Sequence, residues 1–208
     1  MWNGDSDGDW DIYLYQISNG ITTQVSDNSI VDLTPKVYGD YVIWDSYGNG
    51  GGKTYMYQIS SGMTTQIIGN LASEAYPQIN GDYVVWWGDA DVYSEIYLYQ
   101  ISTRITIQVT DNLAGDYFPR INGDYVVWIG YADGDSEIYL YQISAGITRQ
   151  VSNNEINDVY AEVSGDYVVW HGYADGDADA EIYLYEISTG MTSQISNNDT
   201  EDRKRLSE

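Results

Sequence analysis

Short apolar runs separated by polar turns fill almost the whole chain, and their pattern is that of β-strands packed on both faces. In the run EIYLYQI, Ile138 and Leu140 point to one side of an extended chain, and Tyr139, Tyr141 and Ile143 point to the other. A sheet with one face in water would instead alternate apolar with polar residues. The pattern therefore predicts sheets that are covered on both faces, with tyrosine and tryptophan in the core between them.

The apolar runs recur at a fixed interval of 42 residues. Tryptophan marks the five copies, at Trp2, Trp44, Trp86, Trp128 and Trp170. Further landmarks keep the interval: Pro35, Pro77 and Pro119, with Ala161 in the next copy, and Asp40, Asp82, Asp124 and Asp166. The fifth copy carries a two-residue insertion before its EIYLY segment. A period of about 40–50 residues built from short strands is typical of propeller blades. The sequence therefore predicts an all-β fold, a β-propeller built from five 42-residue repeats.

Each copy reads as four strands. The first begins near the proline (YPQIN), the second is DYVVW, the third is EIYLYQIS, and the fourth is ITTQVS or a close variant. Glycine-containing turns separate the first strand from the second and the third from the fourth, although Arg104 replaces the glycine of the later turn in one copy. The proline is expected at the start of its strand, where its missing N–H is tolerated.

The repeats predict a single domain over residues 1–197, followed by a polar tail at 198–208. The chain begins at the tryptophan that ends a second strand, so the first copy is expected to lack its opening pair of strands. A closed ring, an open arc, a ring completed by a second copy of the chain and a fragment of a longer protein all fit this incomplete terminal blade. Radial repeats normally hide their sheet edges by closure.

Composition narrows the possible functions. There are 22 Tyr and 7 Trp but no Cys, which favours strands and excludes disulfides, thiolate metal sites and cysteine nucleophiles. The formal charge of −24 disfavours nucleic acid and anionic membranes, because phosphate binding depends on Lys and Arg. No apolar run is long enough for a membrane span, so no membrane insertion is expected. The N-terminus lacks a signal sequence, and a signal peptide removed earlier is compatible with that.

Acidic residues cluster between the second and third strands. The candidate ligands are Asp5, Asp7, Asp9 and Asp11 in the first copy, Asp89, Asp91 and Glu95 in the third, Asp133, Asp135 and Glu137 in the fourth, and Asp175, Asp177, Asp179 and Glu181 in the fifth. Calcium takes about six to eight oxygen ligands, and flexible loops rich in aspartate supply them. Magnesium fits less well, because it requires stricter octahedral geometry. The loops therefore predict bound Ca2+, and a solvated charged hairpin is the alternative.

The second copy differs, because its loop reads DSYGNGGGKT. Asp45 and Asn49 remain there, but Lys53 stands where the other copies carry an acid. This loop is expected to hold no calcium. The contrast favours a ligand role for the acidic loops, since a role in solubility alone would not need it.

The repeat resembles the TolB-like, or PD40-type, β-propeller repeat. The resemblance rests on DGDSEIYLYQIS, followed by ITRQVS and then YPQINGDYVVW, and it covers nearly the whole array. It implies a propeller fold and a place among archaeal or bacterial surface proteins, whose members serve as binding scaffolds, envelope components or non-catalytic domains beside hydrolases. The chain departs from the family pattern in two ways: Ile-Asn-Gly-Asp replaces Ser-Pro-Asp-Gly, and the acidic loops carry extra aspartates.

Few residues suggest catalysis. The only histidine, His171, is interpreted as an isolated exposed side chain, with a metal ligand or a general base as the alternatives. The stretch GNGGGKT lacks the spacing of a phosphate-binding loop. Paired carboxylates could support glycoside hydrolysis, but acids recur in nearly every copy and none marks one pair as special. No enzymatic activity is therefore expected.

The predicted function is a non-catalytic calcium-binding module, extracellular or at the cell surface, in which Ca2+ stabilises or adjusts the arrangement of the blades. The alternative is a glycan-binding or carbohydrate-processing domain that uses Trp10 or Trp87 for stacking, since both fall outside the tryptophan repeat. A scaffold whose charge serves solubility alone is a third interpretation. The expected partners are calcium, a surface protein or glycan, and another copy of the chain that completes the propeller.

Overall fold

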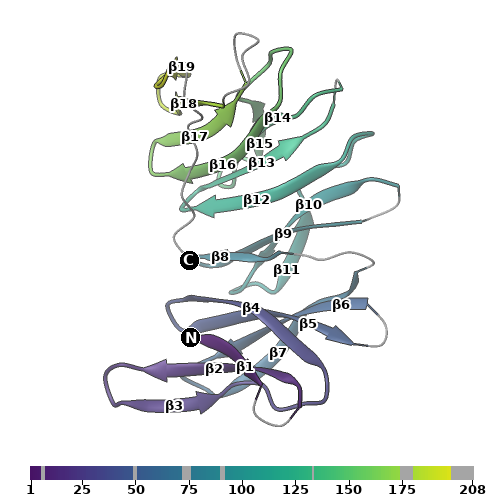
Figure 1. Ribbon diagram of the computed structural model, residues 1–208, viewed down its shortest axis with the longest axis vertical. Helices are drawn as coiled ribbons and strands as arrows, with labels where there is room; N and C mark the ends of the chain where they lie inside the picture. The colour runs from purple at the N-terminus through teal and green to yellow at the C-terminus, as the bar shows by residue number, and fades with distance from the viewer. Residues whose placement is uncertain are drawn as a thin grey trace. The chain divides into compact units, whose positions relative to one another are not determined.

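A computed structural model describes residues 1–5, 8–48, 51–71, 76–89, 92–132, 134–173 and 180–197. Within these ranges the protein contains 19 strands in five antiparallel sheets and no helix (Figure 1). It follows that no helix of these ranges is long and apolar enough to cross a membrane. The predicted tail at 198–208 lies outside the described residues.

Each sheet corresponds to one repeat and forms one blade. Blade one has β1 (Trp2–Asp5), β2 (Trp10–Gln16) and β3 (Ile21–Gln24). Blade two has β4 (Val31–Tyr38), β5 (Tyr41–Gly48), β6 (Gly51–Gln58) and β7 (Met63–Leu71). Blade three has β8 (Gln78–Asn80), β9 (Tyr83–Asp89), β10 (Ser94–Gln100) and β11 (Ile105–Gln108). Blade four has β12 (Asp116–Asn122), β13 (Tyr125–Gly130), β14 (Glu137–Gln142) and β15 (Ile147–Gln150). Blade five has β16 (Asp158–Ser164), β17 (Tyr167–Gly172), β18 (Glu181–Glu186) and β19 (Met191–Gln194).

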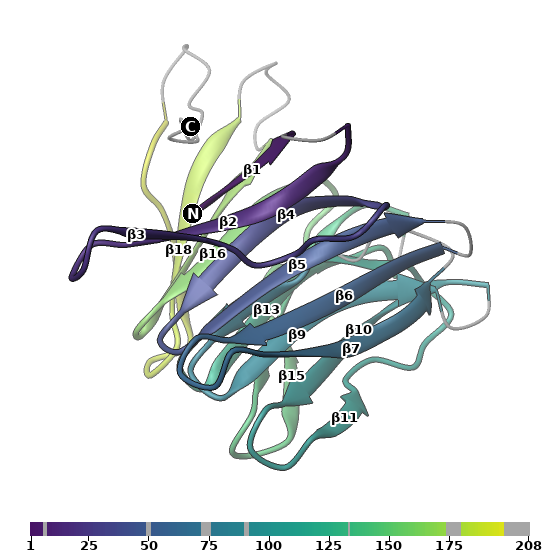
Figure 2. The same ribbon diagram turned by 90° about the horizontal axis from the view of Figure 1, so that it is seen from below.

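Within each blade, strands that follow one another in the chain are hydrogen-bonded neighbours, as Figure 2 shows for β4 to β7. The prediction of four-stranded blades is therefore confirmed for blades two to five. The chain packs into two compact units. The first comprises Met1–Val92 and Tyr97–Gln108, and the second comprises Tyr93–Ile96 and Val109–Glu208. That residues 1–197 form a single domain stays a prediction.

Blade one differs from the expectation for the first copy. Its second strand is present as β1, which pairs with β2 from Trp2 opposite Tyr13 to Asp5 opposite Trp10. In the described residues blade one therefore has three strands, and not only the later two. The sequence NGD after Trp2 continues the extended chain, although it contains none of the apolar residues that mark the second strand in the other copies.

A stack of tryptophan on tyrosine is repeated in the core of every blade. The ring centroids lie 5.6 to 5.8 Å apart with interplanar angles of 15° to 21° in Trp2–Tyr13, Trp44–Tyr55, Trp86–Tyr97, Trp128–Tyr139 and Trp170–Tyr183. All of these indoles except that of Trp2 are buried. In the second unit, Trp170 of blade five shares a cluster with Ile138 and Leu140 of blade four. The predicted core between blades is confirmed in this unit.

The turn from the first strand to the second has the same structure in blades two to five. Gly39, Gly81, Gly123 and Gly165 stand first in two-residue turns with φ of +55° to +60°. Positive φ at this position is that of a type II′ hairpin, which favours glycine. The aspartate that follows accepts hydrogen bonds from the turn between the third and fourth strands. In blade four, Asp124 accepts them from the Ser144 N–H at 2.8 Å, from the Ser144 hydroxyl at 2.5 Å and from Gln142 at 3.1 Å.

The predicted position of the proline, at the start of the first strand, holds only in blade three, where Pro77 directly precedes β8. In blade two the first strand begins four residues before Pro35, in blade four it begins three residues before Pro119, and both prolines lie within the strand. The strand register shifts there, between Leu33 and Lys36 and between Tyr117 and Arg120. A β-bulge leaves a residue out of the ladder, so proline's missing N–H costs no hydrogen bond.

Candidate functional site

The predicted calcium ligands fall into three groups. Asp7, Asp91, Asp133, Asp175, Asp177 and Asp179 lie outside the described residues. Asp5 and Asp89 are exposed and Asp9 and Asp135 are half-buried, all four in or beside the predicted loops. Asp11, Glu95, Glu137 and Glu181 are almost completely buried, at 0% to 4% exposure. The acidic positions of one continuous sequence motif thus have different environments.

The buried group belongs to the start of the third strand, where the protein itself supplies hydrogen-bond donors. In blade one, the Ser26 hydroxyl donates to Asp11 Oδ1 at 3.2 Å and accepts from the Ile12 N–H at 2.9 Å. In blade four, the Ser152 hydroxyl donates to Glu137 Oε2, and the Asn154 N–H donates to Oε1 at 2.6 Å. These carboxylates therefore tie the third strand to the segment that leaves the fourth.

Blade five repeats this contact. Ser196 donates to Glu181 Oε2 at 2.5 Å and accepts from the Ile182 N–H at 2.9 Å. In blade three a threonine, Thr110, takes the place of the serine. The Ile96 N–H donates to Thr110 Oγ1 at 2.9 Å, and the Asn112 N–H donates to Glu95 Oε1 at 3.2 Å. The recurrence of Ser or Thr fifteen residues after the acid is a sequence signal for this structural contact.

A second set of buried carboxylates was not predicted. Asp32, Asp116 and Asp158 are at most 2% exposed and lie at the start of the first strand of their blades. An asparagine four residues earlier donates its side-chain N–H to each of them, at 2.7 to 2.8 Å. The recurring Asn-x-x-x-Asp pattern, at 42-residue spacing, is the signal that could have identified them.

These two sets approach each other in the second unit. Burial raises the pKa of Glu137, and the nearby charges of Asp158 and Asp135 raise it further, against the hydrogen bonds from Ser152 and Asn154. Burial also raises the pKa of Asp158 and of Asp116, with hydrogen bonds acting in the opposite direction. Carboxyl groups without a cationic partner thus accumulate at this end of the blades, which disfavours the fully ionised state.

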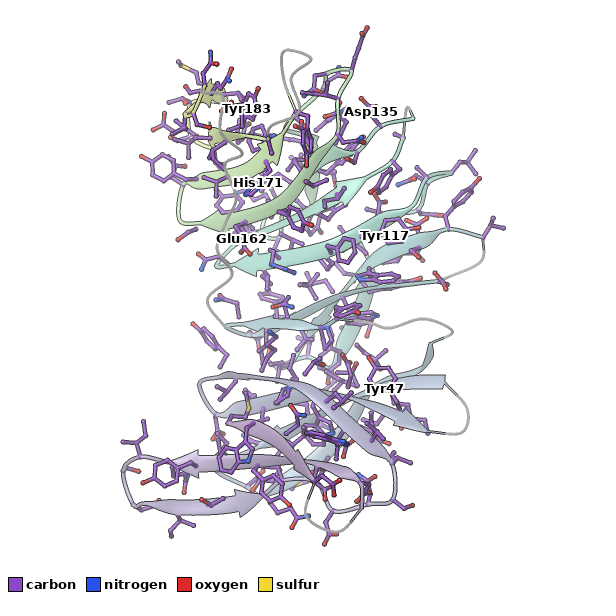
Figure 3. The ribbon with its side chains drawn as sticks, in the orientation of Figure 1. Tyr47, Tyr117, Asp135, Glu162, His171 and Tyr183 are labelled. Carbon is purple, nitrogen blue, oxygen red and sulfur yellow. The ribbon has the colours of Figure 1, made fainter. Side chains whose placement is uncertain are left out.

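The loop carboxylates stand on a shared backbone turn. Gly8 has φ of +113° and Gly134, the equivalent residue of blade four, has φ of +104°. No atom lies within 4 Å of the Cβ position at either glycine, so the backbone conformation, not space, requires glycine there. The Gly8 N–H donates to Asp5 Oδ1 at 2.9 Å, which curls the loop of blade one. Figure 3 shows Asp135 beside this turn in blade four, at the end of the sheet.

Blade two has no loop of this kind. Its second and third strands pair as far as Gly48 opposite Gly51, and Lys53 lies opposite Ser46 in the ladder. Asp45 is buried in β5, where it accepts hydrogen bonds from Thr34 and Thr54, each at 2.9 Å. Asn49, the other possible ligand, lies outside the described residues. That this blade holds no calcium stays a prediction.

Among the residues with described positions, no three Asp, Glu or His side chains converge as they would around a metal ion. A cavity of about 410 Å³ lies in blade four beside the acidic loop. Its lining includes Asp116, Trp128, Tyr131 and Tyr139. The Trp128 N–H donates to Asp116 Oδ1 at 2.9 Å, so the buried carboxylate has a protein donor on each oxygen.

The aromatic and histidine candidates occupy different environments. Trp10 is 43% exposed, and Trp87 is half-buried and stacks on Tyr76 with centroids 6.2 Å apart. His171 was expected to be exposed, but it is only 7% exposed. It lies in β17 with its ring at right angles to Tyr160, at a centroid distance of 5.6 Å. The position after the repeated tryptophan is therefore a strand position, not the start of the loop.

Comparison with known proteins supports the fold. No family model matches the chain, and no curated protein matches it in sequence. Solved structures do match. TolB from Acinetobacter baumannii matches with a TM-score of 0.60 and 15% identity, over 90% of this chain and 49% of TolB. The chain has a TolB-like β-propeller fold.

Two enzymes share this fold with the chain. An oligogalacturonate lyase in complex with manganese matches with a TM-score of 0.63 and 13% identity, over 93% of this chain and 61% of the lyase. A prolyl endopeptidase matches with a TM-score of 0.73 and 12% identity, over 93% of this chain and 32% of the peptidase. The chain thus spans about half of TolB and a third of the peptidase, and at these identities the similarity establishes the fold alone.

Proposed function

We propose that this protein is a non-catalytic calcium-binding β-propeller module that acts outside the cell or at its surface. The observation that carries the proposal is the common turn at Gly8 and Gly134, each followed by a half-buried aspartate, Asp9 or Asp135. A shared backbone conformation at equivalent positions of two blades indicates a common local role for the Asp-Gly-Asp sequence.

The buried acids at the start of the third strand already accept hydrogen bonds from the protein, so we assign calcium to the loop carboxylates. In blade one these are Asp5, Asp7 and Asp9, and in blade four Asp133 and Asp135. The loops of blades three and five would use Asp89 and Asp91, and Asp175, Asp177 and Asp179. Carbonyl groups and water would complete the coordination, as is usual for calcium.

Charge supports the same proposal. The chain carries 32 acidic and 8 basic residues, and the one salt bridge identified among the described residues is that between Arg120 and Glu162. A divalent cation would relieve the repulsion between neighbouring loop carboxylates. The lyase with the same fold was solved with manganese, so a propeller of this type can accompany a divalent metal. Calcium is abundant outside cells, where extracellular modules bind it at roughly 10⁻⁴–10⁻³ M.

The test is urea unfolding of EDTA-treated protein with and without about 5 mM calcium, and with magnesium for comparison. Mass action predicts a stabilisation of about 1–2 kcal/mol by calcium for each occupied loop if the dissociation constant lies in the extracellular range. The double variant Asp9→Asn/Asp135→Asn is expected to lose the part of this stabilisation that comes from blades one and four. Identical unfolding curves with and without calcium would overturn the proposal.

The matched control is the double variant Asp27→Asn/Asp111→Asn. Both residues are exposed and lie outside the acidic loops, so the control removes the same charge. If calcium acts only by screening the net charge of −24, the two double variants will respond equally. A specific loop site requires the control to keep the response of the unmodified protein.

A further inference from the structure

Four residues outside the acidic loops share an unusual backbone conformation. Thr34, Tyr76, Phe118 and Tyr160 have φ of +52°, +43°, +55° and +57°. They are spaced by 42 residues, and each directly precedes Pro35, Pro77, Pro119 or Ala161. The fold thus places one strained non-glycine residue at the β-bulge of the first strand in blades two, four and five, and just before the first strand in blade three.

Burial of the aromatic side chains does not explain this strain. The left-handed conformation costs a residue other than glycine about 1–2 kcal/mol, so glycine would be favoured at these four positions. Yet none of the four positions is glycine, and three are aromatic. The aromatic side chains are not buried in return, because Tyr76, Phe118 and Tyr160 are 40%, 48% and 66% exposed. Strained residues that persist with exposed side chains are typical of functional sites.

The side chain that these residues contact also changes from blade to blade. Thr34 donates a hydrogen bond to Asp45 at 2.9 Å, Tyr76 stacks on Trp87, and Tyr160 meets His171 edge-on. The proline or alanine, the turn and the core tryptophan around these pairs remain nearly constant between repeats. A constant frame that presents variable exposed side chains is the arrangement expected of a recognition surface.

In the second unit two of these positions, Phe118 and Tyr160, lie on strands that contact each other. The first strands β12 and β16 run side by side (Figure 1) and contact each other. Arg120 Nε lies 3.1 Å from Glu162 Oε1, and the Gly165 N–H donates to Asn122 Oδ1 at 3.3 Å. Phe118 and Tyr160 stand two residues before Arg120 and Glu162, so they occupy the same level of the two strands. Figure 3 shows Glu162 and His171 in blade five.

We propose that Phe118 and Tyr160 form a binding site for a neutral carbohydrate chain. Aromatic faces bind the C–H face of a pyranose ring, and they keep a large contact area rigid at low entropic cost. The Arg120–Glu162 pair, at 34% and 35% exposure of its side chains, offers fixed donors and acceptors to sugar hydroxyls. This site uses none of the calcium-loop residues, and neither Trp10 nor Trp87.

The charge of the protein selects the class of sugar. A net charge of −24 repels uronic acids and sulfated glycans, and among the described basic residues Arg120 is already paired with Glu162. Neutral hexose or N-acetylhexosamine chains meet no such penalty. A basic peptide would be attracted by the same field, and its binding at this surface is a separate outcome of the test.

The test combines a glycan array with calorimetric titration of neutral gluco-, xylo- and N-acetylglucosamine oligosaccharides, all in EDTA. Binding in EDTA makes the result independent of the calcium proposal. The variants Phe118→Gly and Tyr160→Gly are each expected to weaken binding about tenfold, the loss of one aromatic contact. Both are expected to leave the urea midpoint unchanged or to raise it, because glycine relieves the strain at positive φ.

Tyr167→Ala is the matched control, since Tyr167 is a 47% exposed aromatic residue of blade five without positive φ. It is expected to leave binding unchanged. The proposal is overturned if no neutral glycan binds, if acidic glycans bind better, or if the two glycine variants bind as the unmodified protein does. A peptide of arginine and proline serves as a further probe, and its binding in place of sugars would assign the surface to a protein partner.

Discussion

Arg104 adopts φ of +59° in the turn between β10 and β11, where the other blades carry Gly20, Gly62, Gly146 and Gly190 at φ of +66° to +72°. Its N–H donates to the Gln100 carbonyl at 2.8 Å, as the glycine N–H does in the other four turns. The turn is therefore the same in all five blades, and its geometry comes from the backbone. The left-handed conformation has a free-energy cost for arginine that it does not have for glycine.

Arg104→Gly is expected to raise the free energy of unfolding by about 0.5–1 kcal/mol, the relief of strain less the greater freedom of glycine in the unfolded chain. The reverse change in blade four, Gly146→Arg, is expected to lower it by a similar amount. Urea unfolding at pH 7 measures both. A loss of stability in Arg104→Gly would show that the arginine makes a compensating contact.

At the level of strands and turns, the sequence predicts most of the elements, but it does not predict the β-bulges or the different environments of the acidic residues. The 42-residue period and the two-faced apolar runs predict the strands and the tryptophan core correctly, because burial on both faces requires that pattern. The sequence does not predict the β-bulge between Tyr117 and Arg120, because the pairing register of a strand depends on its partner strand. The acidic motif DGDSE predicts one site, but Glu137 turns into the protein while Asp135 stays near the surface.

The hydrogen bonds of Asp124 provide a prediction about an element, because they join the β12–β13 turn to the β14–β15 turn. Burial tends to raise the pKa of Asp124, but the hydrogen bonds from Ser144 and Gln142 outweigh it and lower the pKa below 3.8. A lowered pKa in the folded state gives stability that is present above the unfolded value and is lost as the pH falls through the folded value.

Ser144→Ala is therefore expected to cost about 1 kcal/mol at pH 7, a modest value because the site is partly solvated, and less as the pH falls below 3.8. Urea unfolding at pH 7 and at about pH 3 measures the difference. Ser18→Ala is the matched control: Ser18 stands at the equivalent place of blade one, and within the described ranges its hydroxyl donates to no aspartate. An equal cost in both variants, or a cost that does not change with pH, would contradict the assignment.

At the level of the whole molecule, two sets of carboxyl groups respond to pH in opposite directions. Burial raises the pKa of Asp116, Glu137 and Asp158, so their ionisation at neutral pH destabilises the folded state. That penalty is removed as the pH falls through the raised folded-state values toward the unfolded values of 3.8 and 4.5. Protonation also reduces the net charge of −24 and its self-repulsion. The half-buried Asp82 and Asp124 act in the other direction, because their pKa values are lowered from 3.8.

The free energy of unfolding in EDTA is therefore expected to rise as the pH falls from neutral toward the unfolded values of 3.8 and 4.5, and to decline at lower pH. Urea unfolding across this range measures the profile. The double variant Asp116→Asn/Asp158→Asn, which removes two of the buried ionisations, is expected to flatten the rise, whereas Asp27→Asn/Asp111→Asn is expected to keep most of it. If the two double variants flatten the rise equally, it reflects net charge alone. If stability falls steadily from pH 7, the buried carboxyl groups are not the dominant charges in the folded protein.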